Sequence, residues 1–347
     1  MYSPIVQSQL MAFHNLIRLD EENQILREKR DQLLERLQRG LRRDFMAKGK
    51  VPPSFSTLNQ GSYAMNTGIT PADGEFDIDV GVVFEISRRD FPDPVVVKAW
   101  VRDALAGPNT KITIRNSCVT VSYVKNGNPY YHVDIAVFCP SSNGEQMYIG
   151  KGRENSLEKS RNWEPADPKG LIKLINGHRK GDEAAQFRRV IRYLKSWRDE
   201  TFKKTGNAAP VGIGLTVAAY HWFQPQTRTV EKTQQFDDLA TLRALVKQML
   251  DRFSDGFLGL WEYRLRVALP VAPKTDVFAR MSLKQMKDLE TELKTLLASL
   301  SRAGAEVDPV AACEILRTVF GQRFPIPKPS TTGKRLAAPS VMPTSYS

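Results

Sequence analysis

Residues 60–80 decide how this sequence is interpreted, and they read QGSYAMNTGITPADGEFDIDV. The stretch ends in an apolar, β-branched run that contains Asp77 and Asp79, which is typical of a strand. Successive side chains of a strand point to opposite faces, so the two carboxylates share one face while Ile78 and Val80 lie toward a core. Neighbouring carboxylates repel each other unless a cation lies between them, and hard oxygen ligands suit Mg²⁺ or Mn²⁺. The sequence therefore predicts a divalent metal site at Asp77 and Asp79.

A turn that suits phosphate precedes this strand. Gly61 allows the backbone to approach a ligand closely, and the Ser62 hydroxyl with neighbouring N–H groups can bind phosphate oxygens. A third carboxylate is expected from another strand, and the run HVDIAVF at residues 132–138 places Asp134 between two apolar residues. Metal and phosphate are therefore predicted to meet in one cleft.

The order and spacing of these motifs resemble the nucleotidyltransferase superfamily of DNA polymerase beta, and in fuller form the bacterial cGAS/DncV-like nucleotidyltransferases (CD-NTases). A downstream run, FRRVIRYLKSWRD at residues 187–199, resembles the helix on which that family carries a phosphate-binding lysine. Further agreement lies at residues 270–277 and 319–325, so the resemblance covers roughly residues 10–327. It implies that the catalytic, metal-binding residues are Asp77, Asp79 and Asp134. It implies that the nucleotide-binding residues are Gln60, Gly61, Ser62 and Lys195.

The resemblance also implies a reaction. Two Mg²⁺ or Mn²⁺ ions in the site would assist a ribose hydroxyl in an in-line displacement at the α-phosphate of a nucleoside triphosphate (NTP), with release of pyrophosphate. The product would be a cyclic di- or trinucleotide second messenger of a cyclic-oligonucleotide anti-phage (CBASS) defence system. Two alternatives stay open: a template-independent RNA or tRNA nucleotidyltransferase, and a catalytically silent nucleotide-binding sensor.

Composition bears on partners and location. The 347 residues carry a net charge of +12, which favours anionic partners such as nucleotides or nucleic acid. No apolar stretch approaches the roughly 20 residues of a membrane span, and the N-terminus lacks the plan of a signal peptide. We therefore expect a cytoplasmic, monomeric protein without a membrane partner. The three cysteines have no zinc-site spacing, so the zinc insertion of the DNA-sensing animal relatives has no counterpart and no double-stranded DNA activator is expected.

The expected fold class is α+β, with two lobes. Residues 1–165 would form a polymerase-beta-like catalytic lobe with a mixed sheet, braced by a long N-terminal helix, and residues 166–327 a helical nucleotide-binding lobe. Residues 9–45 have helical spacing, which residues 20–22 (Asp-Glu-Glu) either break into two helices or continue as a solvated face. The Pro-, Ser- and Thr-rich tail at 328–347 is expected to be flexible, and the resemblance implies that a regulatory protein partner could act on it.

Local patterns predict most of the remaining elements. A helix is expected at residues 92–105, and strands at 111–115 and 119–124 lead into an Asn-Gly turn at 126–127. Further helices are expected at 184–204, 215–223, 236–253 and 283–300. Residues 147–167 form either a mobile basic loop over the triphosphate or a solvated surface. The family often has a serine near the nucleotide base, but this chain has Gly212 and Gly214 in that region, so the contact with the base stays open. The glycine pair is equally consistent with the turn that starts a helix.

Overall fold

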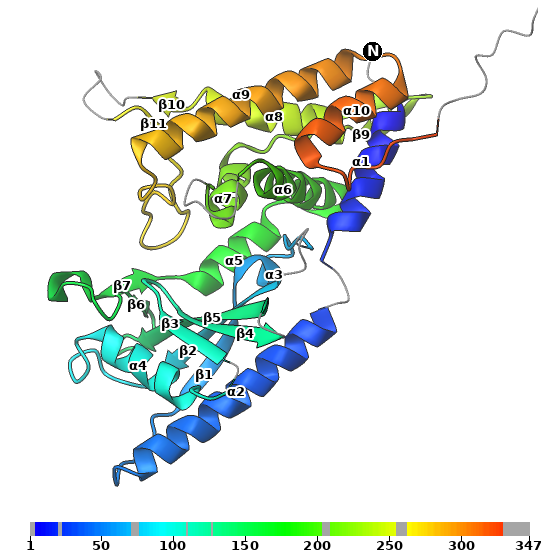
Figure 1. Cartoon of the computed structure of the whole chain (residues 1–347). Helices are drawn as coiled ribbons and strands as arrows, with labels where there is room; N and C mark the ends of the chain where they lie inside the picture. Colours follow the sequence, from blue (N-terminus) through cyan, green and yellow to red (C-terminus); the bar gives the residue numbers. More distant parts are fainter. Residues whose placement is uncertain are drawn as a thin grey trace, which may run out of the picture.

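The protein has two lobes (Figure 1). The computed structural model describes residues 4–19, 23–70, 76–108, 110–125, 128–202, 209–254 and 262–328. One lobe is built on a β-sheet and the other consists mainly of helices, which confirms the predicted α+β class. Within the described residues, no helix combines the length and the apolar character that crossing a membrane requires.

The sheet is mixed, as predicted. Its central path runs β1-β2-β5-β4-β3, in which β2 and β5 are parallel and the other pairs antiparallel. β6 extends the sheet from β5, and β7 pairs with β6. The strands are β1 (Phe55–Asn59), β2 (Phe76–Phe84), β3 (Thr110–Ile114), β4 (Val119–Lys125), β5 (Asn128–Pro140), β6 (Met147–Gly150) and β7 (Trp163–Ala166).

Two helices, α2 (Asn23–Met46) and α4 (Pro94–Ala104), form one apolar core with the sheet. Leu37 of α2 and Val101 of α4 are fully buried there with Val80 and Val133 of the strands. The two helices cross so closely that a Cβ added at Gly40 would lie 2.0 Å from the carbonyl oxygen of Ala104. One face of β2 and β5 is thus occupied by apolar packing, and their polar side chains lie on the other.

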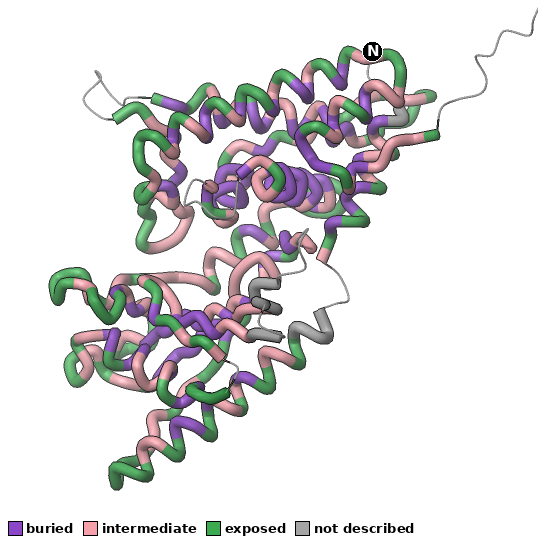
Figure 2. The backbone as a smooth tube through the Cα atoms, in the orientation of Figure 1, coloured by how far each residue is buried: buried purple, intermediate pink, exposed green. Residues whose placement is uncertain are grey.

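The helical lobe packs around α6 (Gly181–Thr201), which Figure 2 shows almost wholly buried in its middle part. Tyr193 and Trp197 of α6 are among the largest buried side chains of the protein. The surrounding helices are α5 (Pro168–Gly177), α7 (Gly212–Trp222), α8 (Asp238–Leu250), α9 (Leu283–Ala305) and α10 (Pro309–Phe320). Two short hairpins join them, β8 (Thr227–Val230) with β9 (Thr233–Phe236) and β10 (Phe253–Ser254) with β11 (Arg264–Leu265). α6 to α9 were predicted, whereas α5 and α10 were not.

The N-terminal arm consists of two helices, α1 (Pro4–Ile17) and α2, on either side of residues 20–22, which lie outside the described part. Leu10 and Phe13 of α1 are fully buried in the core of the helical lobe. α2 instead belongs to the core of the sheet. The arm therefore contacts both lobes, with one helix for each (Figure 1).

Candidate active site

Two of the predicted carboxylates are neighbours across the sheet. Asp79 of β2 and Asp134 of β5 are paired residues of the parallel ladder. Paired residues of a sheet point to the same face, and the residues that flank both aspartates in sequence are buried in the apolar core on the other face. Asp77 is paired with His132, but its side chain lies outside the described part, so its place in the site stays a prediction.

A hydroxyl that was not predicted holds one of these carboxylates. Thr120 of β4 is paired with Asp134, and its Oγ1 donates a hydrogen bond of 2.6 Å to Asp134 Oδ1. This bond fixes the orientation of the Asp134 carboxylate. Cys118 lies beside the pair, and burial, reinforced by the Asp134 charge, raises the pKa of its thiol to about 12. The thiol is therefore protonated and inert near neutral pH.

The predicted phosphate turn lies against Asp79. Residues Gly61–Ala64 form the single helical turn α3, which Gly61 opens with φ of 66°. A Cβ added at Gly61 would lie 1.8 Å from Asp79 Oδ2. Only glycine allows both this backbone conformation and this approach, so the turn and the Asp79 carboxylate are positioned together.

A cavity of about 600 Å³ opens beside this turn, between the two lobes. It is lined by Gln60, Gly61, Ser62 and Asp79 from the lobe that contains the large sheet, and by Lys195, Arg198 and Asp199 from α6. Residues 271–273 and Thr275, within the 270–277 segment noted in the sequence, also line it. The structure thus brings five of the predicted site residues to one cavity, and Asp134 adjoins it through Asp79. Its volume lies in the range of small-molecule sites.

Lys195 is buried in the wall of this cavity. Its Nζ donates to the carbonyl oxygen of Thr67 at 3.0 Å and to Thr67 Oγ1 at 3.1 Å. Burial and, to a smaller extent, the charges of Arg198 and Arg192 lower the pKa of Lys195 to about 7, although the Asp79 charge acts in the opposite direction. An anion in the cavity would favour the charged form of this lysine.

The segment at 147–167 is largely ordered by β6 and β7, with a short 3-10 helix at Glu158–Ser160 between them. It sends Lys151 and Glu164 to the cavity wall, where Lys151 Nζ donates to Ser117 Oγ at 3.0 Å. The basic side chain of Arg161 is instead paired with Asp93 at 3.2 Å. One of the predicted basic residues therefore reaches the cavity, and it comes from the end of a strand.

The two glycines at the start of α7 have different environments. Gly212 lines the cavity near Arg198, whose Nη1 would lie 2.9 Å from an added Cβ. A Cβ at Gly214 would lie 2.2 Å from the ring of Phe278, so that glycine is required for packing. Gly212 is thus the one that faces the cavity, and it also begins the helix.

The donor set suits a hard divalent cation. Asp79 and Asp134 present carboxylate oxygens from neighbouring strands, which are the ligands that Mg²⁺ and Mn²⁺ prefer. Among the described side chains no group of three or more acidic, histidine or cysteine residues is close enough to hold a metal ion. Of the three predicted metal ligands, Asp79 and Asp134 have described side chains, and the place of Asp77 stays a prediction.

A mixed sheet with acidic residues on adjacent strands, a glycine-serine turn against them and a helical lobe across the cavity define a nucleotidyltransferase. Residues 55–138 match the family model described as "Cyclic GMP-AMP synthase DncV-like, nucleotidyltransferase domain". Those residues contain the turn, β2 and the Asp134 strand. Over these residues the chain is similar to the DncV-like nucleotidyltransferases, the bacterial CD-NTase group that the sequence motifs predicted.

A curated relative and solved structures agree with this assignment. A cyclic GMP-AMP synthase of Escherichia albertii is 27% identical over 157 residues, which are 42% of this chain and 32% of that protein, about a third of its length. The DncV cyclic AMP-GMP synthase of Vibrio cholerae superposes with a TM-score of 0.68 at 16% identity, covering 90% of this chain and 93% of the other. The 3'-deoxy ATP bound form of DncV superposes with a TM-score of 0.67 at 17% identity, covering 90% and 92%. At such identities these structures establish a shared fold.

Proposed function

We propose that this protein joins NTPs into a cyclic di- or trinucleotide and releases pyrophosphate. The observation that carries the proposal is the pairing of Asp79 with Asp134 beside the Gly61 turn, at a cavity large enough for nucleotides. Acidic residues and a phosphate turn meeting at one cavity suit chemistry at a nucleotide phosphate. Bound NTPs in relatives, such as the GTP form of DncV, support the substrate class.

Asp77, Asp79 and Asp134 would hold two Mg²⁺ or Mn²⁺ ions. When bound, such ions lower the pKa of the attacking hydroxyl and neutralise charge on the attacking and leaving oxygens. Thr120 supports this arrangement from the side, because its hydrogen bond fixes one oxygen of Asp134. The close packing of Gly61 against Asp79 fixes the Asp79 carboxylate relative to the phosphate turn.

The remaining groups of the cavity would bind and orient the triphosphate. Ser62 and the backbone of its turn would contact phosphate oxygens, and Lys195 would offer its charge from the opposite wall. A ribose hydroxyl of the acceptor would then form a bond to the α-phosphorus. The bond from the α-phosphorus to the bridging oxygen would break, pyrophosphate would leave, and the hydroxyl proton would pass to solvent. A repeat of this step between the ends of the linear product would close the ring.

The proposed role is synthesis of a second messenger for CBASS anti-phage defence in the cytoplasm. The family supports this role, because cyclic nucleotide synthesis is the activity that names the matching relatives. A regulatory protein partner acting on the C-terminal tail is proposed on the same ground, and residues 329–347 of that tail lie outside the described part. A double-stranded DNA activator is not part of the proposal.

The test follows the α-phosphate and the γ-phosphate of each NTP separately by radioactive labelling. Purified protein is incubated with all four NTPs and Mg²⁺ or Mn²⁺, with ³²P in the α or the γ position of one NTP at a time, and the products are treated with phosphatase and separated by chromatography. We expect a phosphatase-resistant product that retains α label and lacks γ label, and no such product from Asp79→Asn.

Added RNA distinguishes the alternative activity. Label that appears only on the RNA would contradict the proposal and favour an RNA nucleotidyltransferase. Saturable NTP binding without product under any of these conditions would favour a catalytically silent sensor.

A further inference from the structure

Lys98 of α4 is fully buried, and its ammonium group binds backbone carbonyl groups from two segments of the chain. Its Nζ donates to the carbonyl oxygens of Arg115 at 3.1 Å, Asn116 at 2.8 Å and Gly152 at 3.0 Å. An ammonium group has three N–H donors, so these bonds use all of them. Arg115 and Asn116 lie just before β4, and Gly152 lies just after β6. Lys98 with these three carbonyl groups is called the Lys98 hub.

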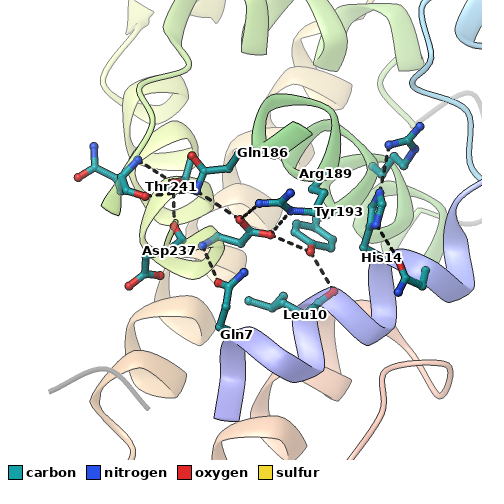
Figure 3. A network of polar contacts seen from close by, with 12 residues as sticks. Gln7, Leu10, His14, Gln186, Arg189, Tyr193, Asp237 and Thr241 are labelled. Atoms are coloured by element: carbon teal, nitrogen blue, oxygen red, sulfur yellow. Dashed lines mark hydrogen bonds and ion pairs between the residues drawn. The ribbon is translucent and has the colours of Figure 1, made fainter. Parts of the chain in front are cut away.

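The Lys98 hub holds a positive charge differently from the helical lobe. There the buried Arg189 is paired with the carboxylate of Asp238, at N–O distances of 2.6 Å and 2.8 Å (Figure 3). In the same region Arg192 Nη1 donates to His14 Nε2 at 3.1 Å. Burial lowers the pKa of Lys98 to about 8, so its ammonium group is charged near neutral pH. A buried charge is costly to the fold, and the bonds that Lys98 makes hold two segments that reach the candidate active site.

Both segments of the hub carry a side chain to the wall of this site. Lys151, next to Gly152, lines the cavity, and its Nζ donates to Ser117 Oγ at 3.0 Å. This bond uses one of the three N–H donors of Lys151. The carboxylate of Glu164 is 4.0 Å away and its side chain is 41% exposed, so this ion pair compensates little of the charge. The hub therefore places an ammonium group in the cavity wall.

The helical lobe brings a second cation to the same place. With the Asn116 amide turned so that its oxygen faces Arg280, this oxygen accepts from Nη1 at 3.1 Å and from Nη2 at 2.7 Å. Burial and, to a smaller extent, the charge of Arg280 lower the pKa of Lys151, although the Glu164 charge acts in the opposite direction. The two cations thus repel each other from the two lobes. An anion bound beside Lys151 would offset this repulsion.

Lys151 lies on the side of the carboxylate pair that is away from the phosphate turn. The turn contacts Asp79 of β2, Asp134 of β5 comes next across the sheet, and Thr120 of β4 follows. Ser117, which binds Lys151, lies just before β4. An in-line displacement places the attacking and the leaving oxygen on opposite sides of the α-phosphorus. A donor whose pyrophosphate lies against the phosphate turn is therefore attacked from the side of Lys151.

We propose that Lys151 binds the phosphate chain of the acceptor nucleotide, and that Lys98 is the positioning residue that places it there. Bonds between an ammonium group and phosphate oxygens are charge-assisted and therefore strong. This inference rests on the proposed transfer reaction and names a group that orients its second substrate. The acceptor is then recognised by its own phosphates as well as by its ribose and base.

The test separates the two substrates of one transfer. The donor is a 2',3'-dideoxynucleoside triphosphate with ³²P in the α position, which has no ribose hydroxyl that could attack. The acceptor is either a nucleoside 5'-(α,β-methylene)triphosphate, which cannot act as a donor, or the same nucleoside without phosphates. An acceptor hydroxyl forms a bond to the α-phosphorus of the donor, pyrophosphate leaves, and the label enters a phosphatase-resistant product. Rates at varied acceptor concentration are measured with Mg²⁺ for each of the four bases.

Lys151→Gln should impair one acceptor and spare the other. We expect the KM for the triphosphate acceptor to rise about tenfold or more at unchanged kcat, because a binding contact is lost. The kcat/KM for the unphosphorylated nucleoside should change by less than about twofold. Lys159→Gln is the matched control, since it removes an exposed lysine of the same segment, and it should leave both values native.

Lys98→Met tests the positioning role, because methionine keeps the length of the side chain and removes the three donors. It should raise the same KM, and the double variant Lys98→Met/Lys151→Gln should be no worse than Lys151→Gln alone. Full additivity of the two effects would overturn the positioning role.

Two further outcomes distinguish this inference from the proposed function. Transfer by the native protein with an unchanged KM for the triphosphate acceptor in Lys151→Gln, or with equal losses for both acceptors, would overturn the role of Lys151 alone. No transfer by the native protein to either acceptor would overturn the proposed function and this inference with it.

Discussion

Asp79 and Asp134 lie directly opposite each other on the parallel strands β2 and β5. The apolar residues on either side of both aspartates fix this arrangement, because they are buried in the core on the other face of the sheet. Side chains of like charge in paired positions destabilise a sheet. The pairing therefore lowers the stability of the sheet, but it presents two carboxylates that a metal ion could bind.

Asp79→Asn and Asp134→Asn should separate these two roles. Each substitution removes one negative charge and keeps the shape, so we expect NTP turnover to fall at least about 1000-fold while the melting temperature stays the same or rises. Turnover is measured as pyrophosphate release and stability by thermal unfolding without metal. Either variant retaining near-native turnover would remove that aspartate from the active site.

Thr120→Val should weaken the site indirectly. The substitution preserves shape and removes the hydroxyl that binds Asp134 Oδ1. We expect turnover to fall about tenfold and the Mg²⁺ concentration for half-maximal rate to rise, because the carboxylate is less well oriented. Thr113→Val is the control, since Thr113 is the exposed partner of Thr120 on β3. An unchanged Mg²⁺ requirement in Thr120→Val would mean that its hydroxyl does not position a metal ligand.

Gly61→Ala should lose activity because its new Cβ would collide with Asp79, and Gly49→Ala is the matched control without such a collision. Gly61 and Gly49 have φ of 66° and 65°, so alanine costs about 1 kcal/mol of stability at either position. Only at Gly61 would the new Cβ collide with Asp79, since nothing lies within 4 Å at Gly49. We expect a loss of turnover of about 100-fold for Gly61→Ala and little change for Gly49→Ala. Similar rates for the two variants would show that the close approach to Asp79 is not needed.

Lys195→Met should stabilise the protein below pH 7 and impair nucleotide binding. The folded pKa of Lys195, about 7, lies below its ordinary value of 10.5, so folding must overcome the cost of a buried charge below pH 7. That cost fades as pH rises from about 7 to 10.5. Methionine also loses the hydrogen bonds that Lys195 donates to Thr67, and this loss reduces the gain. We expect a net increase of about 2 kcal/mol in unfolding free energy at pH 6, and a smaller increase at pH 9.

The same variant reports on phosphate binding. We expect the dissociation constant for NTP in Lys195→Met to rise about tenfold or more at pH 6, where the native lysine is charged. Fluorescence titration with a labelled NTP measures it. Native affinity at pH 6 would exclude Lys195 from the phosphate site, whatever its effect on stability.

The pH dependence of stability should report His14. Its folded pKa of about 4 lies below its ordinary value of 6.5, so the unfolded chain takes up a proton first as pH falls. Unfolding free energy should therefore decrease between about pH 6.5 and 4, by up to about 3 kcal/mol from this residue. His14→Gln, which keeps an acceptor for Arg192, should remove that part of the decrease in urea titrations. A constant difference between the two proteins across this range would contradict the assignment.

Alternation and helical spacing predicted the elements that carry the site. Both patterns are local, so they placed the strands of Asp79 and Asp134 and the helix of Lys195. They could not predict that Asp79 and Asp134 are paired, because strand order depends on tertiary packing. Thr120 was missed for the same reason, since its partner is identified only by the register of β4 with β5.

The helices that were missed had a recognisable start. α5 follows Asp167 and α10 follows Asp308, and in each the Asp side chain accepts a hydrogen bond from the first helical turn while proline occupies the first position. An aspartate followed by proline is a known helix start, so this signal could have found both.

Mass spectrometry of the reaction product tests the central claim most directly. The intact chain is incubated with the four NTPs and Mg²⁺ or Mn²⁺, treated with phosphatase, and compared with Asp79→Asn and Asp134→Asn prepared in parallel. The account predicts a product whose mass equals a whole number of nucleoside monophosphates less one water for each, present only with the native protein. A phosphatase-sensitive linear product alone, or a cyclic product that persists in both variants, would contradict it.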